Sequence, residues 1–474
     1  MIYIYILDAL RYDHVGGDLT PNFNRLAEDG IFFTNAVSQG TWSNPAAMAL
    51  LTGLYPTAVG NFGDLRQTIK PKKIALPVTV DTIGTIFSRE GFETAAYSTN
   101  EYFSPVYKMD RGFDRMPSLY DLPEYADRAQ ISKKVARQIS RNRELLLPLI
   151  TSKDLLDVMW SDDTAQKHLT VIWSMDTHAP FYDRNLVANL AYDDIEIVSR
   201  LTDDVERAKV LYRDMVSFAD QQFGALVERL KAEGQYEDSL IIVLSDHGES
   251  FGENHQFSHG GLPFEEQIHI PLIVKLPGNK FAGQRNNSLV GLIDILPTLT
   301  DCYNITLKKR VDGQSLLPVI RGESPGHNFL MVNDQTQDNM WYYGALRKID
   351  SKIIFRTVNR EKLKELPKPP TYKRPLREKL QKYLEHPSYL TWEFIPGLMF
   401  RKQSWVFDLT QDPDEQKNLF YGPRGLVVWA KAMREFIRLR NRAIKFFKAN
   451  VRSVQVAHTD EAVEQRLRDL GYLE

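Results

Sequence analysis

Short apolar segments alternate with amphipathic segments along the first two thirds of the chain. The apolar segments predict strands over Ile2–Leu7, Thr94–Tyr97, Leu169–Ser174, Leu240–Leu244 and Ile270–Lys275. The clearest amphipathic segment is Glu206–Lys231, where apolar residues recur near helical spacing. Strands that alternate with helices predict an α/β fold, with a mostly parallel sheet covered on both faces. Ligands bind such sheets at the carboxyl ends of the strands.

Two parts of the chain depart from this pattern. Residues from about 107 to 167 are charged and helix-like, so we expect a helical insert there. After Pro297, the apolar runs Phe329–Val332, Trp341–Arg347, Lys352–Thr357 and Trp405–Leu409 predict an antiparallel sheet. We therefore expect a catalytic domain over residues 1–305 and a smaller C-terminal subdomain over residues 306–474, with a basic linker at Lys362–Lys382 and a basic helix at Val427–Ala449.

Composition narrows the functional class. The 474 residues include 59 Lys and Arg against 61 Asp and Glu, a formal net charge of −2. This balance provides no overall field that favours nucleic acid or an anionic membrane. No apolar run approaches the length of a membrane span, so an integral membrane protein is not expected. The single Cys302 excludes a disulfide framework and predicts a cytoplasmic location.

Polar residues follow two of the predicted strands directly. Asp8 follows the first strand, and Asp246 and His247 follow Leu240–Leu244 within "SDHGESFGENHQFSHGG". Two carboxylates and an imidazole at one sheet edge suit a divalent cation. A single aspartate in this position is also typical of a turn or a helix cap. Ser43, in "GTWSNPAAMALLTG", has the same ambiguity, since a serine before a helix start is a common N-cap.

Six motifs together connect the chain to a known family. They are "ILDALRYDHVG", "TPNFNRLAEDGIFFTNAVSQGTWSNPAAMALLTGLYP", "GFETAAYSTNEYFSP" with "DRGFD", "WSMDTHAPF", "SDHGESFGENHQFSHGG" with "EEQIHIPLIVKLPG", and "WVFDLTQDPDEQKNL". With these motifs the chain resembles the sulfatase family of the alkaline phosphatase superfamily, and only the last motif falls in the second domain. The resemblance implies an alkaline-phosphatase-like, doubly wound and mostly parallel sheet, a smaller C-terminal α/β domain and a metal-dependent ester hydrolase.

The resemblance also assigns expected roles, residue by residue. Ser43 matches the nucleophile, and its oxygen would join Asp8, Asp246 and His247 around one divalent metal ion. His178 matches the histidine that protonates the leaving oxygen, and His259 matches the residue that holds the oxygens of the transferred group. The expected substrate-binding residues are Tyr97 and Thr99, which match contacts in phosphonate-cleaving relatives, and Asn100, which would line the same pocket or cap a turn.

Two departures from the family pattern affect the expected chemistry. Many sulfatases begin with paired aspartates, whereas here the second position is Ala9, which removes one metal carboxylate. Sulfatases that form formylglycine carry a Cys/Ser-x-Pro-x-Arg pattern, whereas here Ala47 replaces the arginine. We therefore expect Ser43 to stay serine, which favours a phosphoester, phosphodiester or phosphonate over a sulfate. The metal could be Ca²⁺, Mn²⁺, Mg²⁺ or Zn²⁺.

Two other functions remain open at this point. A two-metal phosphodiesterase or phosphotransferase of the same superfamily would need a second ligand cluster, for which Asp176 and His178 offer a start. A non-catalytic homologue would bind an anion or a glycan in the same pocket. The expected partner is a small-molecule or glycan-linked sulfate or phosphate ester. The basic terminal helix is compatible with a homo-oligomer.

Overall fold

The computed structural model describes residues 1–60, 74–117, 150–162, 167–189, 191, 196–198, 203–335, 341–358, 403–420, 423–450 and 455–456. None of the helices in these ranges is long and apolar enough to cross a membrane.

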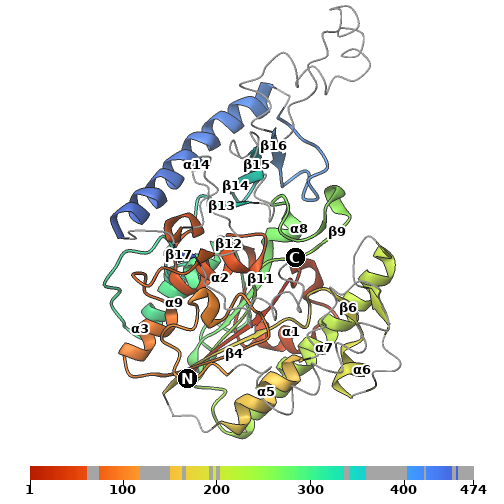
Figure 1. Ribbon diagram of the computed structural model, residues 1–474, viewed down its shortest axis with the longest axis vertical. Helices are drawn as coiled ribbons and strands as arrows, with labels where there is room; N and C mark the ends of the chain where they lie inside the picture. The colour runs from red at the N-terminus through yellow and green to blue at the C-terminus, as the bar shows by residue number, and fades with distance from the viewer. Residues whose placement is uncertain are drawn as a thin grey trace, which may run out of the picture.

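A seven-stranded sheet forms the centre of the molecule (Figure 1). In spatial order its strands are β12 (Gln284–Gly291), β2 (Ile31–Val37), β11 (His269–Lys275), β8 (Leu240–Ser245), β1 (Ile2–Leu7), β5 (His168–Ser174) and β4 (Glu93–Ser98). Strand β11 runs antiparallel to both of its neighbours, and every other pairing is parallel. The α/β fold with a mostly parallel sheet is therefore confirmed, as are the five predicted strands.

The hydrophobic pattern missed two strands on one side of the sheet, β2 and β12. The middle of β2 carries the polar residues Thr34 and Asn35, and β12 begins with the polar run Gln284–Ser288. β12 is an edge strand whose first residues are partly exposed, so burial does not require apolar side chains there. An apolar run is consequently a weak signal for edge strands.

Helices cover both faces of the central sheet (Figure 1). One core contains Ile2, Ile4 and Ile6 of β1 with residues from α2 (Ser43–Thr52), α3 (Ile83–Arg89) and α9 (Ile295–Cys302). The other core contains Tyr3, Tyr5 and Leu7 with residues from α1 (Pro21–Glu28), α5 (Ser152–Ser161) and α7 (Val205–Ala232). Successive side chains of β1 thus enter opposite cores, as the alternation of a strand requires. The predicted helix Glu206–Lys231 is confirmed as α7.

Short elements complete the part of the chain that carries the central sheet. They are η1 (Tyr12–His14), η2 (Pro56–Val59), β3 (Ile74–Ala75), η4 (Pro105–Tyr107), β6 (Phe181–Tyr182), α6 (Arg184–Ala188), β7 (Ile197–Val198), β9 (Ser250–Phe251), η7 (Glu253–His255), β10 (Phe257–Ser258), α8 (Glu265–Ile268), η8 (Pro277–Asn279), η9 (Leu292–Asp294) and α10 (Leu317–Ile320). Of the predicted insert 107–167, α5 is a helix, and residues 118–149 and 163–166 lie outside the described residues.

A second sheet lies beside the first and is antiparallel throughout. Its order is β13 (Leu330–Gln335), β14 (Trp341–Arg347), β15 (Ser351–Val358) and β16 (Gln403–Asp408), which confirms the four predicted strands. The long helix α14 (Pro423–Asn450) runs alongside this sheet (Figure 1) and confirms the predicted terminal helix. β17 (Gln455–Val456) pairs with β3, and the predicted linker Lys362–Lys382 lies outside the described residues.

Candidate active site

Ser43 is the first residue of α2, an alanine-rich helix that is buried on every side. The N-cap position belongs to Trp42, whose side chain makes no capping hydrogen bond, so the interpretation of Ser43 as an N-cap is wrong. The Ser43 hydroxyl instead donates to Asp8 Oδ2 over 3.2 Å and lies 3.4 Å from His247 Nε2. At the first turn of a helix, backbone N–H groups without intrahelical partners and the helix dipole favour an anion.

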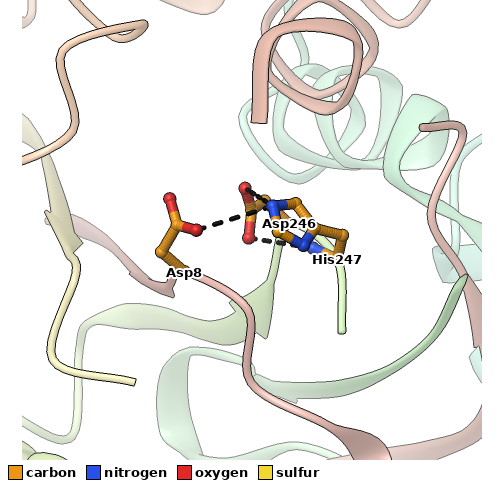
Figure 2. A group of neighbouring side chains, drawn as sticks. All are labelled: Asp8, Asp246 and His247. Carbon is orange, nitrogen blue, oxygen red and sulfur yellow. Dashed lines mark hydrogen bonds and ion pairs between the residues drawn. The ribbon is translucent and has the colours of Figure 1, made fainter. Parts of the chain in front are cut away.

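Asp8 is fully buried at the carboxyl end of β1 and is held by several donors. Its Oδ2 accepts from Ser43, from Trp173 Nε1 over 3.1 Å and from the side-chain amide of Asn100. The hydroxyl of Thr177 donates to the Asp8 main-chain carbonyl over 2.6 Å. These contacts fix one carboxylate oxygen and direct the other, Oδ1, toward Asp246 and His247 (Figure 2).

Asp246 and His247 directly follow β8, the neighbour of β1 in the sheet. Asp246 Oδ1 accepts from the main-chain N–H groups of Ala9 and His247, at 3.1 and 2.9 Å. His247 Nδ1 donates to the Gly248 carbonyl over 2.8 Å, which leaves Nε2 facing both carboxylates. Burial and the nearby imidazole of His259 lower the pKa of His247 to about 3, so this ring is neutral.

These three residues fit a divalent cation. One ligand atom from each of Asp8, Asp246 and His247 lies within 4.8 Å of the others, and all three residues are buried (Figure 2). Asp8 Oδ1 and Asp246 Oδ2 are buried oxygens that accept no hydrogen bond from the described residues. Burial and the charge of Asp8 raise the pKa of Asp246 well above its ordinary value. Two such carboxylates repel each other strongly unless a cation lies between them.

His178 and His259 lie next to this group, and their Nε2 atoms are 3.3 Å apart. His178 Nε2 is also 4.0 Å from Asp8 Oδ1, and the ring of His259 lies against that of His247. His259 Nδ1 pairs with the buried carboxylate of Glu249 at 3.2 Å. Burial by itself would lower the pKa of His259, but the charge and hydrogen bond of Glu249 raise it. Burial lowers the pKa of His178, so His259 takes up a proton first.

The three substrate-binding residues expected from the sequence lie in three different environments. Asn100 reaches the site and donates to Asp8. Thr99 accepts from the Met175 main-chain N–H over 3.0 Å and joins the ends of β4 and β5. The hydroxyl of Tyr97 donates to Asp162 over 2.5 Å, in the core against α5. The structure therefore brings Asn100 to the candidate site but does not bring the Tyr97 hydroxyl there.

Two further side chains contribute to the site, and only Trp173 was not considered from the sequence. Trp173 donates to Asp8 from the penultimate position of β5, and Glu249 holds His259. Tryptophan in a buried strand indicates core packing, so its polar N–H gave no signal. Glu249 and Glu253 are the two glutamates of the glycine-rich segment "SDHGESFGENHQFSHGG", and both were candidates to support the site. Only the fold distinguishes Glu249 from Glu253, which pairs with Arg11 at 2.7 Å.

The second metal cluster considered for Asp176 and His178 has no support in the geometry. The Asp176 carboxylate accepts from the main-chain N–H and the hydroxyl of Ser152 at the start of α5. Its oxygens are thus used by the helix that covers the opposite side of the sheet from α2. Within the described ranges, the group of Asp8, Asp246 and His247 is the one cluster with metal-ligand spacing.

Known proteins resemble the chain in sequence and in fold. A family model described as Sulfatase matches residues 5–305. The ulvan-active sulfatase of Formosa agariphila is 25% identical over 334 residues, which cover 65% of this chain and 61% of that protein. The chain thus matches about three fifths of the length of this curated relative.

Solved structures extend the likeness of the fold to both sheets. The phosphonate monoester hydrolase of Agrobacterium radiobacter superposes with a TM-score of 0.66 at 17% identity, covering 93% of this chain and 95% of that one. The phosphonate monoester hydrolase of Silicibacter pomeroyi gives a TM-score of 0.64, also at 17% identity, with the same coverage of 93% and 95%. At this identity the likeness concerns the fold alone.

Proposed function

The chain belongs to the sulfatase family, and from this membership we propose that it is a metal-dependent hydrolase that cleaves a phosphoric or sulfuric ester through a covalent intermediate on Ser43. The observation that carries the proposal is the position of the Ser43 hydroxyl, 3.2 Å from Asp8 Oδ2 and 3.4 Å from His247 Nε2. A serine that only capped a helix would not meet a cluster of metal-ligating side chains.

Asp8, Asp246 and His247 would hold one divalent ion, with the Ser43 oxygen beside them. When bound, the ion lowers the pKa of a coordinated hydroxyl and stabilises negative charge on the transferred group. The Ala9 position leaves this group with two carboxylates and one imidazole. The imidazole nitrogen favours a transition metal over Ca²⁺ or Mg²⁺.

The remaining steps fall to Ser43 and the histidine pair. The Ser43 hydroxyl gives up its proton to solvent, and its oxygen attacks phosphorus or sulfur. The bond between phosphorus or sulfur and the leaving oxygen then breaks. His178 passes the proton of the histidine pair to that leaving oxygen. Until that transfer, the positive charge of His259, paired with Glu249, and the first turn of α2 stabilise the anionic oxygens. Water then cleaves the serine ester and releases the acid.

Residue 43 favours a phosphorus ester over a sulfate. Ala47 occupies the place of the arginine in the modification pattern, so we propose that Ser43 stays a serine. A serine sulfate is a stable ester that lacks the route of hemiacetal collapse open to formylglycine. The proposed substrates are therefore phosphomonoesters, phosphodiesters or phosphonate monoesters, on a small molecule or a glycan.

The experiment measures turnover of p-nitrophenyl sulfate, p-nitrophenyl phosphate, bis-p-nitrophenyl phosphate and p-nitrophenyl phenylphosphonate by the metal-loaded protein. We expect a phosphorus ester to dominate, and mass spectrometry of the peptide that contains residue 43 to show serine. A dominant sulfatase rate together with formylglycine at position 43 would refute the phosphorus preference. No turnover of any ester by metal-loaded protein would instead favour the non-catalytic anion binder.

Two further properties remain predictions. The single cysteine supports a cytoplasmic location, which fractionation of the native host tests. The basic helix α14 supports a homo-oligomer, which the mass in solution tests.

A further inference from the structure

The second sheet contacts the candidate site at the residue that follows His259. The hydroxyl of Tyr343, on β14, donates to the Gly260 carbonyl over 2.6 Å, and Tyr343 is buried. The N–H of Gly260 donates to the carbonyl of Thr41 over 2.7 Å, two residues before Ser43. Both main-chain polar groups of Gly260 are thus bonded, one to the segment that leads into α2 and one to the second sheet.

The backbone around His259 needs such support. Ser258 has φ of +66° and Gly260 has φ of +74°, so His259 lies between two residues in the left-handed region. A serine in that region is held there by its surroundings and not by its own preference. The hydrogen bonds to Gly260 therefore help to determine where the imidazole of His259 lies.

A second contact holds the same face of β14 against the segment 260–265. Arg347 lies four residues after Tyr343 on the strand, so both side chains leave the same face. The Arg347 guanidinium pairs with Glu265, the first residue of α8, at 3.0 Å. Lys352 of β15 pairs with Glu265 at 2.9 Å. The second sheet therefore holds both ends of the segment 260–265.

We infer that Tyr343 is a positioning residue, which acts on the reaction through the Gly260 peptide by fixing the imidazole of His259. The inference rests on the proposed function, because it assigns His259 to the anionic oxygens of the substrate. It gives the C-terminal sheet a part in the chemistry of a site whose other residues all come from the first 259 positions. Without the Tyr343 hydroxyl, the Gly260 carbonyl loses its donor from β14 and His259 gains freedom.

The test is a double-mutant cycle of Tyr343→Phe and His259→Ala, measured with the most active p-nitrophenyl ester and with inorganic vanadate as inhibitor. We expect Tyr343→Phe to lower kcat/KM by about tenfold and to weaken vanadate inhibition by a similar factor. In the His259→Ala background, the same substitution should change neither quantity, because the residue through which it acts is gone.

Tyr236→Phe is the matched control, because it removes another buried tyrosine hydroxyl, which donates to Asp29 over 2.7 Å at the opposite end of β8. We expect it to lower the melting temperature as Tyr343→Phe does, with vanadate inhibition unchanged. Equal losses from Tyr343→Phe in both backgrounds, or kinetics like those of the control, would overturn the inference. Retained activity in Ser43→Ala would refute the proposed function instead, so the two failures are distinguishable.

Discussion

The imidazoles of His178 and His259 face each other with Nε2 atoms 3.3 Å apart, although the residues are separated by 81 positions in the chain. Nδ1 of His178 is bound to the carbonyl of Ala179, and Nδ1 of His259 is bound to Glu249. One proton between the two Nε2 atoms therefore satisfies both rings. Because the Glu249 carboxylate lies 3.2 Å from His259 whereas the Asp8 carboxylate lies 4.0 Å from His178, the positive charge belongs to His259 and the neutral ring to His178.

Ser43→Ala tests the nucleophile. We expect kcat/KM to fall by on the order of 10³-fold or more, because the variant cannot form the covalent intermediate. Metal binding should persist, since Asp8, Asp246 and His247 are untouched. Kinetics together with metal analysis of the purified variant provide both measurements.

The matched control is Ser239→Ala, another buried serine, whose hydroxyl donates to the Gln235 carbonyl over 2.7 Å at the far end of β8. It should retain full activity. Turnover by Ser43→Ala within a few fold of the wild-type value would show that another group attacks the substrate.

His178→Ala tests the proton donor through the leaving group. An alkoxide leaving group needs a proton in the transition state, whereas p-nitrophenolate is stable without one. We expect a loss of about 10²–10⁴-fold for a methyl ester of the preferred acid and a much smaller loss for the p-nitrophenyl ester. Steady-state rates of both esters provide the measurement.

His327→Ala, which removes a histidine bonded to Asp294 at 2.8 Å, is the control for loss of a partly buried imidazole. Equal losses of the methyl and p-nitrophenyl esters in His178→Ala would mean that His178 positions the substrate without protonating it.

The sequence was most informative where the chemical groups directly follow the ends of strands. Asp8, Asp246 and His247 follow adjacent parallel strands, so their proximity follows from the strand order. Ser43 was harder to assign, because a serine before a helix is equally typical of a cap. The resemblance to the sulfatase family, and not the Ser-x-Pro pattern itself, favoured the nucleophile, and the hydroxyl's contact with Asp8 agrees with that assignment.

The remaining contacts of the site depend on the direction of side chains, which the sequence does not give. Tyr97 and Thr99 lie two residues apart near the end of β4, so the sequence places both near the site. The Tyr97 ring enters the core that faces α5, and its hydroxyl meets Asp162. The contacts of Tyr343 with Gly260 depend on how the second sheet docks, which no local pattern encodes.

Gly248→Ala tests the packing behind His247. A Cβ on Gly248 would lie 2.1 Å from the Glu266 carbonyl oxygen, a backbone atom that cannot rotate away. The same glycine donates its N–H to Gln267 over 2.8 Å. We expect the free energy of unfolding to fall by about 3 kcal/mol and metal affinity to fall with it, because Asp246 and His247 must shift.

Gly322→Ala provides the comparison, because a Cβ there meets nothing within 4 Å and only its φ of +74° is unfavourable. Gly322→Ala should lower the free energy of unfolding by about 1 kcal/mol and leave metal binding intact. Urea unfolding and metal titration of both variants measure the difference, and equal costs would show that the chain around Glu266 adapts.

Glu415→Gln tests the buried charges that join the two sheets. Glu415 pairs with Lys352 at 2.7 Å, and Lys352 also pairs with Glu265. Burial and the charge of Glu265 raise the pKa of Glu415 to about 8, despite the opposing effect of Lys352. Because the folded protein holds this proton more tightly than the unfolded chain, the group's contribution to stability is complete below about pH 4.5 and is lost as the pH rises through about 8.

Between about pH 6 and about pH 8.5, the free energy of unfolding of the wild type should therefore fall by about 2 kcal/mol relative to that of Glu415→Gln, whose amide does not titrate. Urea unfolding at the two pH values measures this difference, with the exposed Glu206→Gln as control. A difference that stays constant with pH would mean that Glu415 is ionised throughout and that Lys352 balances both carboxylates.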